Sequence, residues 1–86
     1  MNPDLDEFKK ALVPHFMRSV TERFVFCQHV LKIDMQVLQN ADLEGSPLMA
    51  AYGLYEALKH RLTREEIENI KALALAVDPP AGIPRM

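Results

Sequence analysis

The sequence has little cysteine and no long apolar run. Its 86 residues include one cysteine, Cys27, so a disulfide within the chain is impossible. Small secreted domains usually depend on several disulfides, and the single thiol therefore predicts a reducing, cytoplasmic location. The first residues, Met-Asn-Pro-Asp-Leu-Asp-Glu, are acidic and polar, which is the opposite of a signal peptide. No uninterrupted apolar run approaches the ~18 residues of a membrane-spanning helix, so we expect no membrane partner.

Residue patterns typical of metal, cofactor and catalytic sites are also missing. The candidate metal ligands are Cys27, His15, His29 and His60. They show no CxxC or HxxxH spacing, whereas zinc needs three or four converging ligands. No glycine-rich phosphate loop occurs, and Cys27 lies within an apolar stripe, where a thiol is usually inert. We therefore expect no metal site, no cofactor and no enzymatic activity.

The sequence does contain an unusually apolar segment between residues 15 and 39. Apolar residues recur there at helical spacing in two neighbouring stripes. They are Phe16, Val20, Phe24, Cys27, Leu31, Met35 and Leu38, and beside them Phe26, Val30, Ile33 and Val37. On one helix the stripes merge into an arc of roughly 200°, twice the usual minimum for a surface helix. One neighbour covers only part of such an arc, so we expect either a central helix or a second chain that covers the remainder.

Start and stop signals divide the chain into four expected helices. Proline in the first turn marks two beginnings, at Pro3 and Pro47, and Pro14 ends or kinks the first helix. Thr63 and Glu66 form the pattern of a capping box. The predicted fold is all-α, a compact bundle of four helices at about residues 3–12, 15–39, 47–62 and 64–77, with an extended, proline-rich C-terminal tail. The predicted domain division is a single helical domain over residues 1–78 and a flexible tail over residues 79–86.

The third and fourth expected helices carry distinctive faces. The third should face inward through Leu48, Ala51, Tyr52, Tyr55, Leu58 and Leu62. Beside that face lie Ala50, Gly53 and Ala57, which are all small, so a neighbouring backbone can approach closely there. The last turns of the fourth helix, residues 72–77, have no polar face, and we expect that end to be well buried.

Two charged residues, Arg23 and Asp34, fall within the apolar arc. They are ~16 Å apart along one helix and cannot pair within it, yet a buried unpaired charge is costly. In two copies packed antiparallel about a twofold axis between Gln28 and His29, each Arg23 meets the other copy's Asp34. The alternative is that both side chains reach solvent in a monomer. This geometry favours a homodimer.

The number of methionine and aromatic side chains favours a protein-binding function. In general style the chain resembles the small inhibitors, antiactivators and adaptors of bacteria and their phages, although no motif supports a family. We expect a non-catalytic interaction module that docks a partner protein through an apolar helical surface. The predicted interface residues are Phe16, Val20, Arg23, Phe24, Phe26, Val30, Ile33, Asp34 and Val37.

A basic cluster at the junction of the last two helices supports an alternative function. Lys59, Arg61 and Arg64 would contact nucleic acid in a DNA-associated regulator. However, the net charge is −2, from 10 basic and 12 acidic residues, and provides no basic field for a phosphate backbone. Glu65 and Glu66 would also repel phosphates where a recognition helix meets DNA. A third possibility, a carrier of an apolar small molecule, requires a cavity that a sequence does not reveal.

Overall fold

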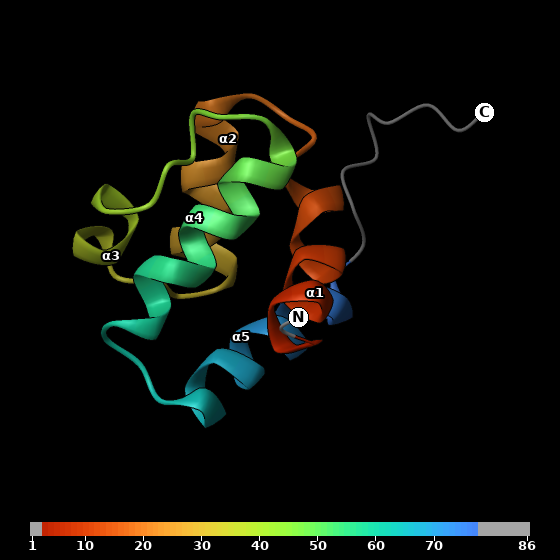
Figure 1. Cartoon of the computed structure of the whole chain (residues 1–86). Coiled ribbons are helices and arrows are strands. Elements are labelled where there is room, and N and C mark those ends of the chain that lie inside the picture. The colour runs from red at the N-terminus through yellow and green to blue at the C-terminus, as the bar shows by residue number, and fades with distance from the viewer. Residues whose placement is uncertain (1–2, 78–86) are drawn as a thin grey trace.

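The described part of the chain consists of helices and the turns between them (Figure 1). The computed structural model describes residues 3–77, and within them no strand is found. The α-helices are α1 (Pro3–Leu12), α2 (Val20–Val25), α3 (Met35–Gln39), α4 (Pro47–Lys59) and α5 (Arg64–Ala76). A 3-10 turn, η1 (Val13–Phe16), follows α1, and a π-helical turn, η2 (Phe26–Val30), continues α2. The predicted all-α fold class is confirmed.

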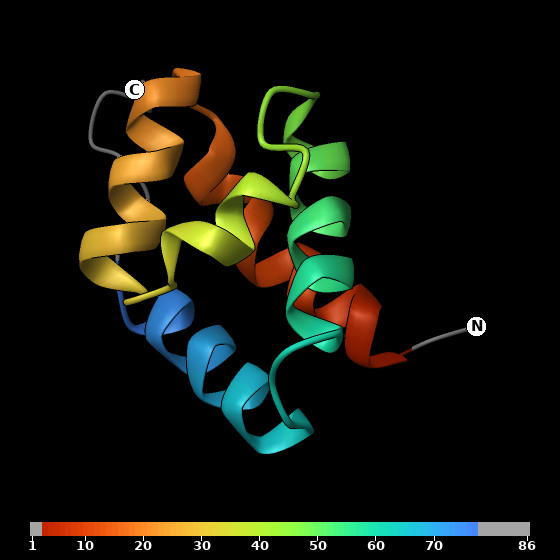
Figure 2. The same ribbon diagram turned by 90° about the vertical axis from the view of Figure 1, so that its left-hand side faces the viewer.

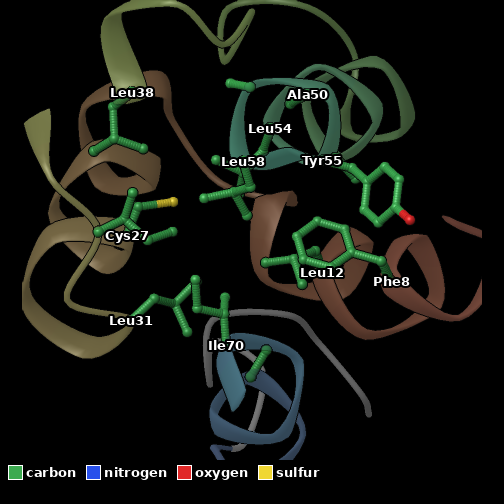
Figure 3. Packing of buried hydrophobic residues seen from close by; sticks show 14 of the residues in the cluster. Phe8, Leu12, Cys27, Leu31, Leu38, Ala50, Leu54, Tyr55, Leu58 and Ile70 are labelled. Atoms are coloured by element: carbon green, nitrogen blue, oxygen red, sulfur yellow. The ribbon is translucent and has the colours of Figure 1, made fainter. Parts of the chain in front are cut away.

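Helix α4 lies at the centre of the packing. It contacts α1, η1, α3 and α5, and α5 also packs against α1. Figure 3 shows the core that these helices enclose, with side chains from α1, the α2–η2 segment, α4 and α5 pointing toward one another. The Phe8 and Tyr55 rings meet with their centroids 5.3 Å apart. Each large apolar side chain buried in this way stabilises the fold by roughly 1.5–3 kcal/mol.

The predicted starts of the last two helices are confirmed. Thr63 accepts a hydrogen bond from the Glu66 amide at 3.2 Å, and the Glu66 carboxylate accepts one from the Thr63 amide at 2.9 Å. Ser46 accepts from the Met49 amide at 3.2 Å and so caps α4. These bonds satisfy amides that have no partner within their helix. The helix expected over residues 47–62 ends earlier, at Lys59.

The expected single helix over residues 15–39 is wrong, because the chain breaks twice within it. Ser19 and Glu22 form a capping box, with both bonds at 3.2 Å, so α2 begins at Val20. The second break follows η2, where Lys32 adopts a left-handed φ of 60° and cannot continue a right-handed helix. Asp34 then caps α3 by accepting from the Gln36 amide at 3.0 Å. Figure 2 shows α2 and η2 as one coil, with α3 turned across toward α4.

These breaks let a single chain cover its own apolar stripes. Phe16, Cys27 and Leu38 are fully buried, although they lie on three different segments. The expectation that one copy leaves much of the arc uncovered is therefore wrong. The finer prediction of a four-helix bundle is not confirmed, since three short segments replace the second helix. The predicted tail, residues 79–86, lies outside the described residues.

A close backbone approach on α4 is confirmed at Gly53. A Cβ atom added there would lie 2.9 Å from the backbone nitrogen of Asp42, in the connection between α3 and α4. Real Cβ atoms essentially never come this close to backbone, so only glycine fits without a shift of the connection. The smallest residue of α4 thus determines how near this connection lies.

We predict that Gly53→Ala destabilises the protein, although alanine is the better helix former by about 1 kcal/mol. The added methyl group must displace the Asp42 backbone, and such overpacking costs about 1–3 kcal/mol. Urea unfolding should show a net loss of about 1 kcal/mol. Lys32→Gly is a useful comparison, because glycine removes the left-handed strain at that position and should stabilise. A rise in stability for Gly53→Ala would contradict the close approach.

Candidate functional site

The interface residues predicted from the sequence lie mostly in the core. Phe16, Phe26, Ile33 and Val37 are buried within the single chain. Val20, Phe24 and Val30 are half-buried, and Asp34 is exposed. The apolar surface that favoured an interface at these residues is already covered for the most part within the single chain.

The Arg23 side chain is 7 % exposed and binds backbone carbonyl groups of its own chain. Its Nε atom donates to the carbonyls of Phe16 at 2.9 Å and Arg18 at 3.2 Å. One terminal nitrogen donates to the carbonyls of Leu43 at 2.5 Å and Gly45 at 2.7 Å. The predicted pairing of Arg23 with a second copy's Asp34 loses its basis, because Arg23 is satisfied internally and Asp34 caps α3.

His15 is a second buried polar residue with a structural role. Its Nε2 atom lies 2.8 Å from the carbonyl oxygen of Ala74, and because that oxygen only accepts, Nε2 carries the proton. The imidazole also stacks on the Phe26 ring, with centroids 4.4 Å apart. Its Nδ1 atom is buried without a hydrogen-bond partner in the part that the structure describes. His15 thereby fixes η1 against the last turn of α5, where carbonyl groups lack partners within the helix.

The Cys27 thiol is fully buried in the core. Burial disfavours the thiolate and raises the pKa of Cys27 to about 12. Since the thiolate is the nucleophile and the metal ligand, this thiol is unreactive at neutral pH.

Within residues 3–77, no group of three or more His, Cys, Asp or Glu residues is placed to hold a metal ion. No helix among the same residues is sufficiently long and apolar to span a bilayer.

The predicted nucleic-acid contacts lie around the α4–α5 turn, and two of them have carboxylate neighbours. Lys59 lies 3.7 Å from Glu56, and Arg64 lies 3.1 Å from Asp4. Arg61 is exposed in the turn between the helices. The ion pairs partly neutralise the cluster, which weakens the attraction to phosphate.

Three large apolar side chains lie side by side on the surface of α4, and we call Leu48, Met49 and Tyr52 the α4 patch. They are 53 %, 52 % and 42 % exposed. Positions three and four apart are neighbours on a helix, so the three side chains form one surface. The expectation that Leu48 and Tyr52 face the core is wrong. The buried face instead runs along Ala50, Ala51, Leu54, Tyr55, Ala57 and Leu58.

A surface groove adjoins the α4 patch where α4 lies against the end of α1, and we call it the α1–α4 groove. Its volume is about 450 Å³. The lining residues are Asp6, Lys9, Lys10, Val13, Pro14 and Leu48. Val13, Pro14 and Leu48 provide apolar walls, and Lys9 and Lys10 provide cationic groups. Asp6 lies 3.9 Å from Lys9, whereas Lys10 forms no ion pair within residues 3–77.

The end of α5 is a second apolar surface, contrary to the expectation that it is buried. Leu73, Leu75 and Val77 are exposed, and within residues 72–77 only Ala74 is buried. The inward stripe of α5 is narrow and consists of Ile67, Ile70 and Ala74. The remaining apolar side chains of this end therefore point away from the core. Residues 78–86, which follow directly, lie outside the described part.

Comparison of the chain with protein-family models, with curated protein sequences and with solved structures gives no match.

We predict that Arg23→Met lowers the free energy of unfolding by about 3 kcal/mol or more, because buried carbonyl groups lose a charged donor. Arg23→Lys should be intermediate, since one ammonium cannot reach both sets of carbonyl groups as a guanidinium does. Arg61→Met is the matched control and should change stability by less than about 0.5 kcal/mol. Urea unfolding measures all three. Equal effects for Arg23→Met and Arg61→Met would contradict the central role of Arg23.

We predict that Cys27 reacts with a thiol reagent far more slowly in the folded protein than in concentrated urea. The raised pKa also predicts a pH dependence of stability. Below the unfolded value of 9.0 the contribution of the thiol is fully present, and it is lost as the pH rises from there toward about 12. The free energy of unfolding, measured across this pH range, should fall less steeply with pH for Cys27→Ala than for the unaltered protein. Identical slopes for the two proteins would contradict the burial of an ionisable thiol.

Proposed function

We propose that this protein is a non-catalytic protein–protein interaction module, of the inhibitor, antiactivator or adaptor type. Its docking surface is the α4 patch with the adjoining α1–α4 groove. The observation that carries the proposal is that three adjacent large apolar side chains on one helix remain about half exposed. Single exposed apolar residues are ordinary, whereas a contiguous set beside a groove is typical of an interaction surface.

The construction of this surface supports a binding role. Ser46 and Pro47 fix the beginning of α4, so the α4 patch lies on the first two turns of a capped helix. Just before this cap, the Gly45 carbonyl accepts a hydrogen bond from the Arg23 guanidinium. Because the backbone of this helix is already ordered, binding of a partner does not have to order it. Methionine and tyrosine are also favoured at contact surfaces, since methionine adapts its shape and tyrosine has few rotatable bonds.

The homodimer predicted from the sequence stays a prediction, and its original support through Arg23 and Asp34 is gone. Sedimentation velocity at micromolar concentration tests it directly. The DNA-associated alternative also stays untested. Nothing in the geometry favours it, because Lys59 and Arg64 each have a carboxylate partner.

We expect Leu48→Glu to abolish capture of the partner from a lysate of native cells while the circular dichroism spectrum stays helical. A charge at the centre of an apolar contact leaves a buried carboxylate unpaired, and such anchor substitutions weaken binding at least about tenfold. Leu73→Glu is the matched control, because it places the same charge on another exposed leucine, which belongs to α5 and lines neither the groove nor the hollow that Lys10 shares with Leu75. Capture lost with Leu73→Glu and kept with Leu48→Glu would move the site to α5.

A further inference from the structure

The proposed function, on which this inference rests, leaves the chemistry of the partner open. We propose that the occupant of the α4 patch and the α1–α4 groove is a short, acidic, amphipathic segment of another protein. Three properties of the surface carry this proposal, namely its area, its shape and its unmatched charge.

The area is too small for two folded proteins to hold together through this surface alone. Three half-exposed side chains and the apolar walls of the groove offer on the order of 300 Å². A stable interface between folded partners buries about 800 Å² on each side. A single helix or short extended segment, by contrast, can bind through two or three apolar anchors. The surface therefore fits a segment better than a second folded copy of this chain.

The shape is that of a track between two elements. The groove is shallow, and Leu48 lines it from α4, beside Val13 and Pro14 at the junction of α1 and η1. Tyr52 continues the apolar surface beyond the groove, because it lies four positions from Leu48 on the same side of α4. A helix lying along this track would place side chains at positions i and i+4 against these residues, and its opposite face would remain in water.

The charge of the groove differs in sign from that of the whole chain. The chain carries −2, yet the groove has two lysines and one aspartate. Within the groove, Asp6 pairs with Lys9, and Lys10 is the exposed cation of the groove that forms no ion pair among the described residues. A glutamate or aspartate on the bound segment would complete this rim, whereas a lysine would be repelled. Exposed ion pairs change affinity only about two- to fivefold, so Lys10 selects the occupant and the apolar anchors hold it.

The test is selection of phage-displayed random peptides on the immobilised full chain, followed by fluorescence polarisation with the best peptide. We expect the selected sequences to combine apolar residues at helical spacing with aspartate or glutamate. Leu48→Glu should weaken binding at least tenfold, and Leu73→Glu should leave it unchanged. Lys10→Glu should weaken it two- to fivefold at low salt but little at high salt, and Lys10→Arg should retain it.

The outcomes separate this inference from the proposed function. Peptides that need Leu48 but show no preference for acidic residues, or that are indifferent to Lys10→Glu, would overturn the acidic segment and leave the docking surface standing. A failure to select any peptide, or binding unaffected by Leu48→Glu, would overturn both. A dimer that Leu48→Glu dissociates would show that the occupant is a second copy, which also overturns the acidic segment. Circular dichroism of each variant confirms that it is folded.

Discussion

The buried guanidinium of Arg23 holds together two parts of the chain that lie between α-helices. One is the end of η1 with the turn that follows it, which contributes the carbonyls of Phe16 and Arg18. The other is the connection before α4, which contributes those of Leu43 and Gly45. Carbonyl groups buried without a donor would cost about 1–3 kcal/mol each, and a charged side chain buried without partners would cost more. The guanidinium and the carbonyl groups satisfy one another, and Arg23 thereby holds the connection from which α4 begins.

The sequence allowed correct prediction of elements whose ends carry a local chemical signal. Helices α1, α4 and α5 begin as expected, because proline and capping side chains act within a few residues. Ser19 and Glu22 carry the same kind of signal, but the continuous apolar periodicity across residues 15–39 masks it. A helical wheel assumes one axis, whereas three short segments with different axes each bury their own stripe. Their apparent arc of 200° was therefore never one surface.

The candidate site was less predictable, because exposure depends on contacts between distant parts of the chain. Leu48 and Tyr52 lie on the same face of α4 as Ala51 and Tyr55, and periodicity alone does not show which of these side chains are exposed. The connection that packs on Gly53 decides this, because it covers the side of α4 that carries the small residues. The structural role of His15 has no local signal, since its acceptor, the Ala74 carbonyl, lies 59 residues away in the chain.

The two exposed apolar surfaces differ in the polar interactions that hold them, and this difference bears on which one suits the proposed docking role. The α4 patch lies on capped turns next to a connection that Arg23 holds through two carbonyl groups. At the end of α5, the hydrogen bond from His15 to Ala74 reaches the last turns, while Lys71 joins Glu7 and Glu68 one turn earlier. These two carboxylates raise the pKa of Lys71, which shows that they favour its charged form. Binding costs least where the backbone that carries the docking surface is already ordered. The α4 patch meets that condition within the described residues, because the polar interactions that hold its helix do not depend on the residues that a partner would cover.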